Sequence, residues 1–423
     1  MTIQELKEGL NEKQTLFIDE FFKGSNICLT GSAGVGKSFV VSKIKRYFDE
    51  NELPVGISAL TGCAAINIGG ATLHSWAGIG LGDGPNSDIL MNVNRNKKAR
   101  NRILSVKTLL IDEISMAKGE LLDKIDYVFK AVRRNNNPFG GIQMIVIGDF
   151  YQLPPIFKNQ EEGKLAFESI SWIKANFKII ELTEIVRQKE DKDFADFLNK
   201  LRKGNVENIK ILNECIDRKF DENKKPVKLY CKNIDVDREN KIKLEQISSE
   251  RKVFNTIDFG EKHHIEFFDK NCPAPKILEL KRGAQVMLLK NLDVENGYCN
   301  GSIGIVTSFT NSGVEVNFQY GKILVERESW EIKEQVLNSE NKLVSRVVAE
   351  RLQIPLKLAW ATTVHKAQGA TLDCAEVDVS DAFAFGQIYC ALSRVKNIKG
   401  LSIKPFSLAR VKANPRVDNF YKY

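Results

Sequence analysis

Short apolar segments alternate with amphipathic stretches along the first part of the chain. Four such segments, each followed by polar or turn-forming residues, cover Asn26–Thr30, Thr108–Ile111, Gln143–Ile147 and Ile179–Leu182. Apolar runs of this length that alternate with helical patterns are typical of parallel strands, because helices then cover both faces of the sheet. The pattern therefore predicts an α/β domain over residues 1–185.

From about residue 284 the pattern changes to a regular alternation of apolar and polar positions. It is clearest in AQVMLLK, GSIGIVTSFT, GVEVNFQ and KILVERESW. A period of two is typical of antiparallel strands with one buried face, and the α/β pattern returns near Pro355. We therefore predict a small antiparallel barrel at 284–354, inserted into a second α/β domain that comprises 186–283 and 355–423.

The length of the chain agrees with this architecture, and its net charge indicates which kind of molecule it binds. The chain has 423 residues, enough for two or three domains, and its 43% hydrophobic and 27% charged residues are typical of globular proteins. The formal charge of +8 suits a polyanionic partner, although many proteins that bind no nucleic acid are as basic. One segment without acidic residues holds six basic ones: Arg95, Lys97, Lys98, Arg100, Arg102 and Lys107. It is either a nucleic-acid contact or an ordinary solvated face.

The spacing of the cysteines indicates whether the chain has a zinc site, and the apolar runs indicate in which cellular compartment it is found. The eight cysteines show no CxxC or Cys/His spacing that would build a zinc site, so we expect reduced, buried thiols. The opening MTIQELKEGLNEKQ lacks an apolar core, and no run of about 18 apolar residues occurs. We therefore expect a soluble intracellular protein without a membrane partner, in the cytoplasm of a prokaryote or virus-infected cell or in a eukaryotic nucleus.

The strongest chemical motif fits GxxxxGK[ST] and lies between the apolar segment SNICLT and the amphipathic stretch FVVSKIKRYF. Its residues are Gly31, Ser32, Ala33, Gly34, Val35, Gly36, Lys37 and Ser38. Glycines let backbone N–H groups surround phosphate oxygens, and the following helix adds the positive end of its dipole. We expect Lys37 to reach the β- and γ-phosphates of ATP and the Ser38 hydroxyl to bind Mg²⁺.

A second motif, LLIDE, ends a predicted strand with two acidic residues. Asp112 is expected to hold the Mg²⁺ shell, largely through water, and Glu113 to act as the general base that deprotonates the attacking water. An apolar strand that ends in two acids is common by itself. Beside a phosphate-binding loop, however, it is the second half of a nucleotide-hydrolysing site.

Three further side chains are candidates for contact with the γ-phosphate. Gln152 follows the strand in MIVIGDFYQLPPIF and would contact the γ-phosphate or the water, unless this is an ordinary strand-to-loop turn. Arg187 in ELTEIVRQ and Arg394 in YCALSRV would neutralise charge in the transition state, if the second domain presents them across a cleft. Surface salt bridges are the alternative for both arginines.

Taken in this order, the segments resemble superfamily 1B DNA helicases, most closely the Pif family. The matching segments span nearly the whole chain: ALTGCAAINIGGATLHSWAGIG, IDEISMAKGELLDKIDYVFKAVR, PFGGIQMIVIGDFYQLPPI, ELTEIVRQ, LAWATTVHKAQGATLD and GQIYCALSRV. The resemblance implies two RecA-like parallel-sheet domains with an SH3-like barrel inserted in the second, and a small wedge insertion at about residues 80–107. It also implies ATP and Mg²⁺ as cofactors.

The resemblance assigns nucleotide contacts to individual positions. Gln14 matches the glutamine that recognises adenine, and an amide can both donate to and accept from a base edge. Gln152 matches the γ-phosphate sensor, and Arg187 and Arg394 match two arginine fingers from the second RecA-like domain. Gly369 lies where the family's backbone approaches the triphosphate.

The resemblance also implies a track for single-stranded DNA and for single-strand/duplex junctions. The matched positions are Thr61, Gly62, His74 and Ser75 in the first domain and Thr363, His365, Lys366 and Gln368 in the second. Such polar groups suit phosphate contact without sequence preference. Trp76 and Phe150 either stack on bases or belong to the core, which is the safer expectation. Asn300 and Gly301 match the family's barrel entrance, although an ordinary turn explains them equally well.

These observations predict an ATP-dependent 5′–3′ DNA helicase that works as a monomer and couples hydrolysis to closing and opening of its two domains. The direction of travel rests on the resemblance alone. Two alternatives stay open, namely an NTPase switch or clamp that depends on single-stranded DNA but does not unwind, and an RNA-directed helicase.

Overall fold

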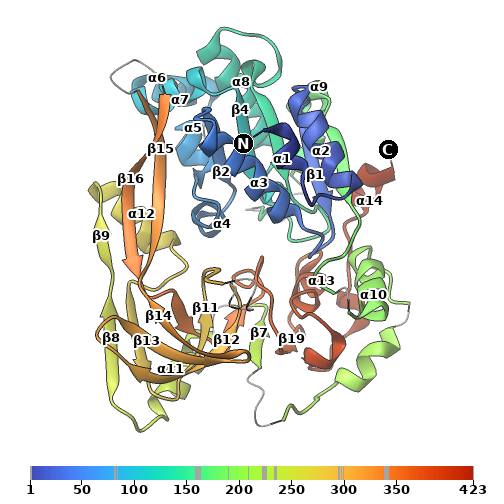
Figure 1. Cartoon of the computed structure of the whole chain (residues 1–423). Helices are drawn as coiled ribbons and strands as arrows, with labels where there is room; N and C mark the ends of the chain where they lie inside the picture. Colours follow the sequence, from blue (N-terminus) through green and yellow to red (C-terminus); the bar gives the residue numbers. More distant parts are fainter. Residues whose placement is uncertain are drawn as a thin grey trace.

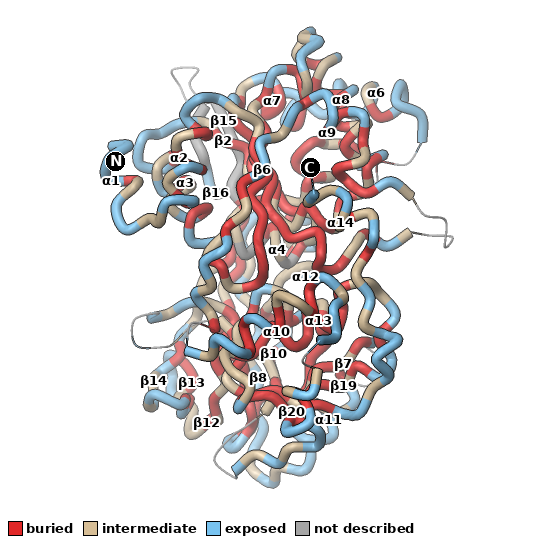
Figure 2. The backbone as a smooth tube through the Cα atoms, turned by 90° about the vertical axis from the view of Figure 1, so that its right-hand side faces the viewer, coloured by how far each residue is buried: buried red, intermediate tan, exposed pale blue. Residues whose placement is uncertain are grey.

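The computed structural model describes residues 2–422 apart from 81, 83, 158–162, 189, 208, 222–225, 233–235, 294, 295, 297, 299 and 338–342. For residues 63, 66, 67, 333–337 and 343–345 it describes the backbone alone. The described part of the chain forms two lobes, which lie one above the other in Figure 1. In each lobe a buried sheet lies at the centre and exposed segments lie on the outside (Figure 2).

A six-stranded parallel sheet forms the first lobe, in the order β3-β2-β4-β5-β1-β6. Its strands are β1 (Ile27–Gly31), β2 (Val55–Ala59), β3 (Ala71–Thr72), β4 (Thr108–Asp112), β5 (Gln143–Ile147) and β6 (Lys178–Leu182). The four strands predicted from the apolar runs are β1, β4, β5 and β6, so this part of the prediction is confirmed. Since β1, β5 and β4 are neighbours, the segments that follow them meet at one edge of the sheet.

Helices cover both faces of this sheet. They are α1 (Ile3–Lys7), α2 (Glu12–Phe22), α3 (Lys37–Glu50), α4 (Gly62–Asn67), α5 (Leu73–Ala77), α6 (Asn86–Arg95), α7 (Lys97–Ser105), α8 (Gly119–Arg133) and α9 (Ile170–Ala175). On one face Leu110 of β4 packs in a core with α1, α2 and α3, and on the other Leu109 and Ile111 pack with α5 to α9. Burial on both faces explains why the strands appear in the sequence as unbroken apolar runs.

The second lobe is built on a four-stranded parallel sheet in the order β18-β7-β19-β20. Its strands are β7 (Val227–Tyr230), β18 (Ala361–Thr363), β19 (Ala375–Asp378) and β20 (Leu401–Ile403). The helices of this lobe include α10 (Lys192–Arg202), α11 (Val236–Glu245) and α13 (Gln387–Leu392). The predicted α/β class with two parallel sheets is therefore confirmed.

A five-stranded antiparallel sheet is inserted into the second lobe, in the order β14-β13-β12-β11-β17. Its strands are β11 (Gln285–Leu288), β12 (Ile303–Phe309), β13 (Gly313–Phe318), β14 (Gly321–Glu326) and β17 (Leu356–Leu358). This sheet buries valine and leucine side chains from alternate positions, among them Val314 and Val316. It extends past the predicted end of the barrel at residue 354, and the domain boundaries themselves stay a prediction.

Part of the segment predicted as barrel forms a separate sheet. The long hairpin of β15 (Glu328–Leu337) and β16 (Leu343–Gln353) pairs with β9 (Ile257–Phe259) instead of with the barrel strands. In Figure 1 the hairpin extends along the side of the molecule from the inserted sheet towards α6 and α7. The sheet packs on α12 (Lys262–Asn271), and next to it β8 (Arg251–Asn255) pairs with β10 (Ile277–Lys281).

The last helix, α14 (Pro415–Lys422), returns to the first lobe (Figure 1). Its Phe420 ring stacks on Phe167 at 4.4 Å and also contacts Phe150 and Trp172. The prediction assigned residues 355–423 to the second domain, whereas α14 packs against the core of the first lobe. The apolar residues of a single helix do not indicate which lobe they pack against.

No helix within the described ranges combines the length and the apolar character needed to span a bilayer.

Two glycines test how closely the segment before β12 approaches Thr371, which lies between β18 and β19. Gly301 and Gly283 both have left-handed backbone angles, with φ of +99° and +96°. A β-carbon on Gly301 would lie 2.3 Å from the carbonyl oxygen of Thr371, whereas one on Gly283 would meet no atom within 4 Å.

We expect Gly283→Ala to lower the free energy of unfolding by about 1–2 kcal/mol, the cost of the left-handed conformation. Gly301→Ala should cost clearly more, because it also pushes the barrel away from residue 371. Urea unfolding of both variants measures the difference. Equal losses would contradict the close approach.

Candidate active site and nucleic-acid cleft

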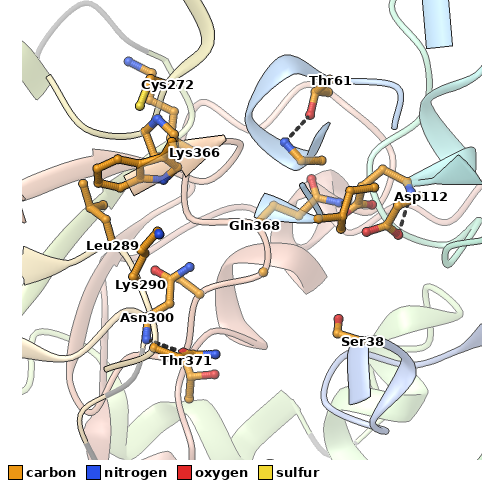
Figure 3. Close-up of a pocket in the computed structure, with 18 of the residues that line it drawn as sticks. Ser38, Thr61, Asp112, Cys272, Leu289, Lys290, Asn300, Lys366, Gln368 and Thr371 are labelled. Atoms are coloured by element: carbon orange, nitrogen blue, oxygen red, sulfur yellow. Dashed lines mark hydrogen bonds between the residues drawn. The ribbon is translucent and has the colours of Figure 1, made fainter. Parts of the chain in front are cut away.

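A cleft of about 2310 Å³ separates the lobes and continues to the inserted sheet. The segments after β1, β4 and β5 line it at the edge where these strands end. Figure 3 shows Ser38, Asp112 and Gln368 around one opening, with Lys290, Lys366 and Asn300 farther along. The cleft thus brings most of the predicted nucleotide residues, though not Gln14, Gly31 or Ser32, and part of the predicted DNA track into one continuous space.

Glycines 31, 34 and 36 give the phosphate loop its shape. Their φ angles are +137°, +83° and +87°. A β-carbon on Gly31 would lie 2.3 Å from the carbonyl oxygen of Leu182, and one on Gly34 would lie 2.5 Å from Cβ of Arg187. Since α3 begins directly afterwards at Lys37, its free N–H groups and its positive dipole end face the loop.

The ammonium group of Lys37 lies within this loop. Its Nζ donates hydrogen bonds to the carbonyl oxygens of Gly31 (2.7 Å) and Ser32 (2.9 Å). Burial lowers the pKa of Lys37, while the nearby Asp149 carboxylate opposes the shift. A phosphate in the loop would give this partly desolvated cation a stronger acceptor than two carbonyls.

Ser38 and Asp112 are the residues that fit Mg²⁺. The Ser38 hydroxyl is exposed at the start of α3, and Asp112 ends the second strand along from β1; both line the cleft. One Asp112 oxygen accepts the N–H of Glu113 at 2.8 Å, and burial raises the pKa of this carboxyl. No cluster of three or more His, Cys, Asp or Glu side chains that could hold a metal occurs among the described residues. An ion here would therefore depend on phosphate and water oxygens as well, which is the usual situation for Mg²⁺.

Glu113 has the properties of a base that works near neutral pH. It adopts a left-handed conformation, with φ of +55°, where β4 ends. Burial and the neighbouring Asp112 carboxylate raise the pKa of Glu113 to about 7, and the charges of Lys37 and Arg394 oppose the shift. Such a carboxyl changes protonation state easily at the pH of the cell.

Gln368 connects Glu113 to Gln152. Its Nε2 donates to Oε2 of Glu113 at 2.9 Å and lies 3.3 Å from Oε1 of Gln152. The prediction placed Gln368 on the DNA track, and its hydrogen bonds to the hydrolytic side chains were not anticipated. They arise because the HKAQG segment of the second lobe faces the ends of β4 and β5, a contact that no sequence spacing indicates.

Both predicted arginines lie at the cleft. Arg187 follows β6, donates its backbone N–H to Gly34 of the phosphate loop at 3.1 Å, and donates from Nη1 to the carbonyl of Ser393 at 3.0 Å. Arg394 belongs to the second lobe and is 2% exposed, with Nε 2.7 Å from the Cys390 carbonyl and Nη2 2.8 Å from the Ser393 hydroxyl. Arg394 is buried and Arg187 is partly buried, and both line the cleft, so their roles as arginine fingers stay a prediction.

Gln14 lies beside the phosphate loop, and Gly369 lines the cleft. Gln14 is buried, and its Oε1 accepts the backbone N–H of Asn11 at 3.1 Å at the start of α2. Its Nε2 lies near Gly36, where an added β-carbon would be 3.1 Å away. Gly369, with φ of +82°, lines the cleft and has no atom within 4 Å of its β-carbon position. Its backbone is thus open to a ligand.

The structure brings only part of the predicted first-domain DNA track to the cleft. Thr61 lines the cleft and accepts the N–H of Ala64 at 3.2 Å. Gly62 is covered by Asn271 of α12, because an added β-carbon would lie 1.9 Å from its Oδ1. His74 is half-buried and Ser75 exposed on the short helix α5, outside the lining of the cleft.

The second-domain track is mixed as well. His365 and Lys366 line the cleft, and burial lowers the pKa of His365. Thr363 is 2% exposed, and its hydroxyl accepts the N–H of Lys366 at 3.2 Å. It therefore shapes the turn that presents Lys366. Asn300 also lines the cleft, and Gly301 lies against residue 371.

One residue of the basic segment has a structural function that the sequence did not reveal. Arg102 is buried and donates to the carbonyls of Trp76 and Ser75, each at 3.0 Å, so it supports α5. The other five basic residues of the segment are exposed: Arg95, Lys97, Lys98, Arg100 and Lys107. Trp76 and Phe150 are 5% and 4% exposed and belong to the core, as expected.

Sequence analysis also missed a set of lysines that line the cleft. They come from both lobes and from the inserted sheet and are Lys45, Lys241, Lys270, Lys290, Lys357 and Lys396. They are scattered along the chain, so no local charge pattern identifies them. Folding alone brings this positive charge to one surface.

Comparison with known proteins gives consistent matches over the chain. The family described as PIF1-like helicase matches residues 9–211, and the DNA helicase Pif1 2B domain matches residues 265–309. The ATP-dependent DNA helicase PIF1 of Danio rerio is 38% identical over 98% of the chain, and the chain spans 64% of that relative's length. The crystal structure of Bacteroides sp Pif1 in complex with ADP-AlF4 is 31% identical, with a TM-score of 0.85 over 98% of this chain and 96% of the other.

Structures of the Bacteroides protein in other states match the chain to different degrees. Bacteroides Pif1 bound to ssDNA has the same identity of 31% and the same coverage of 98% and 96%, but a TM-score of 0.64. Unliganded Bacteroides Pif1 has the same TM-score of 0.85 as the ADP-AlF4 complex. In overall structure the chain is therefore more similar to these two than to the complex with ssDNA.

Proposed function

The chain belongs to the PIF1-like helicase family, and on this premise we propose that it is an ATP-dependent DNA helicase. It binds single-stranded DNA and single-strand/duplex junctions inside the cell, moves 5′ to 3′ as a monomer, and separates duplexes. ATP and Mg²⁺ are its cofactors. The direction and the substrate rest on family membership, and the chemistry rests on the geometry of the cleft.

The observation that carries the proposal is the meeting of groups from both lobes at one nucleotide site. The first lobe contributes the phosphate loop and Glu113, and the second contributes Arg394, whose charge acts on the Glu113 carboxyl. In this proposal Lys37 and the two arginines neutralise the phosphates, and Glu113 takes a proton from the attacking water. Mg²⁺ held by Ser38 and Asp112 would neutralise further phosphate charge.

The proposed track for DNA follows the positive charge of the cleft. His365 and Lys366 of the second lobe, Thr61 of the first and the scattered lysines line the same space. Lysine and hydroxyl contacts to phosphate carry no sequence information, which suits an enzyme that moves along any strand. Contacts from both lobes allow each lobe to hold the strand in turn as the cleft closes and opens.

We infer that DNA acts on hydrolysis through Gln368. This residue is two positions from Lys366 and donates to Glu113 at 2.9 Å. A strand bound by His365 and Lys366 changes the position of this segment, and with it the hydrogen bond on the catalytic carboxylate. Hydrolysis then becomes dependent on DNA.

A strand-displacement assay tests the proposed function. We expect release of the displaced strand from a duplex with a 5′ single-stranded tail, no release from a 3′-tailed duplex, and no activity without ATP. Lys37→Ala should abolish release, because the triphosphate loses its cation. ATP hydrolysis on single strands without release from either duplex would favour the NTPase switch, and stronger stimulation by RNA than by DNA would favour an RNA-directed enzyme.

The pKa of Glu113 predicts how hydrolysis depends on pH. A carboxyl with a pKa of about 7 is protonated below this value and cannot accept a proton from water. We therefore expect kcat/KM for ATP, measured with saturating single-stranded DNA, to fall as the pH drops through about 7 and to reach a plateau above it.

Glu113→Gln is the matched variant, since it keeps the size and removes the titrating group. It should retain ATP binding and lower kcat by about 100-fold or more, with no remaining transition near neutral pH. Normal turnover by Glu113→Gln would rule out the assignment of the base.

A further inference from the structure

A buried ion pair joins the two lobes beside the cleft. Arg202 is the last residue of α10 in the second lobe, and Asp149 follows β5 in the first. Nε of Arg202 lies 3.1 and 3.0 Å from the two carboxylate oxygens of Asp149, and Nη2 lies 2.8 Å from one of them. The side chains of Arg202 and Asp149 are 5% and 0% exposed, respectively. Contact with both oxygens fixes the relative orientation of the two groups as well as their separation.

Aromatic rings from two distant parts of the chain cover this pair. The rings of Tyr151 and Tyr421 are stacked, with centroids 5.1 Å apart, and the Arg202 guanidinium lies 4.8 and 5.4 Å from these centroids. The Tyr421 hydroxyl is hydrogen-bonded to Thr30, which directly precedes the phosphate loop. The Tyr151 hydroxyl donates to Asp418 of α14 at 2.7 Å. Helix α14 thus excludes water from the ion pair and strengthens its attraction.

The same carboxylate contacts the predicted γ-phosphate sensor. Nε2 of Gln152 donates to Oδ2 of Asp149 at 3.4 Å, and the backbone N–H of Gln152 donates to the Asp149 carbonyl at 2.9 Å. On its other side the Gln152 amide oxygen faces Gln368 of the second lobe. Gln152 is therefore held between two contacts that both lead to the second lobe, one direct and one through Asp149 and Arg202.

We propose that Arg202 is a positioning residue for ATP hydrolysis, which sets the orientation of Gln152 towards the γ-phosphate through Asp149. The inference rests on the proposed function, because it concerns the same hydrolytic site. A rotation between the lobes moves Arg202 relative to the first sheet, and Asp149 follows because the pair is dry and doubly hydrogen-bonded. The angle between the lobes thereby controls the position of a side chain at the γ-phosphate.

A double-mutant cycle on Arg202 and Gln152 tests this. The variants are Arg202→Met, Gln152→Ala and the double variant. For each, kcat is measured at saturating single-stranded DNA and divided by the concentration of active sites, which is determined by titration with nucleotide. We expect Arg202→Met alone to lower kcat by about 10- to 100-fold with less than about a threefold change in KM. Since Arg202 acts through Gln152, the double variant should be no slower than Gln152→Ala alone.

Arg351→Met is the control for loss of a buried ion pair as such. Arg351 is 0% exposed and donates to both oxygens of Asp258 at 2.7 Å, entirely within the second lobe and its insertion. Both Arg351→Met and Arg202→Met should lower the unfolding temperature, but Arg351→Met should leave kcat per active site unchanged. A structural function of Arg202 would give the same result for both variants.

A second variant keeps the test decisive if Arg202→Met does not fold. Arg202→Lys retains the charge but cannot bind both carboxylate oxygens in the same geometry, and it enters the same cycle with Gln152→Ala. Losses that add in the double variant, or that occur in KM alone, would overturn the inference. If the wild-type protein hydrolyses no ATP in the presence of DNA, the proposed function is contradicted as well. If the wild-type protein is active but the losses in the double variant add, only the inference about Arg202 is contradicted.

Discussion

The rest of the structure depends on one interaction, in which buried carboxylates of the first lobe face positive charge that includes a guanidinium from the second lobe. Glu113 and Asp112 are buried at the edge of the first sheet, where burial raises the pKa of both carboxyls. Charges that oppose this come from Lys37 of the first lobe and Arg394 of the second. Because unpaired buried charge is costly, a triphosphate in the cleft would give the Lys37 and Arg394 cations a counter-charge.

The strand order makes this possible. With β4, β5 and β1 as consecutive strands in the sheet, three short segments from distant parts of the sequence meet at one edge. The second lobe then faces this edge with HKAQG and with Arg394, and it is also attached through Arg202 and α14. Hydrogen bonds thus join the residues proposed for nucleotide chemistry to the contacts between the lobes.

Much of this was predictable from the sequence, for identifiable reasons. The strands β1, β4, β5 and β6 are buried on both faces and therefore appear as apolar runs, and the phosphate loop has a pattern that its geometry requires. The contacts of Gln368, Arg202 and α14 were not predictable, because each joins residues far apart in the sequence. The separate sheet of β15, β16 and β9 was missed since period-two alternation does not specify the partner strand. The individual roles of the site residues stay predictions.

The central claim is that hydrolysis requires a guanidinium from the second lobe at a nucleotide held by the first, and Arg394→Ala tests it most directly. Single-turnover hydrolysis and binding of single-stranded DNA should be measured on the same preparation. The account predicts that hydrolysis slows by about 1,000-fold or more while the affinity for DNA changes little. The reason is that Arg394 stabilises negative charge that develops on the phosphates in the transition state. Hydrolysis at the wild-type rate, or an equal loss of hydrolysis and DNA binding, would contradict it.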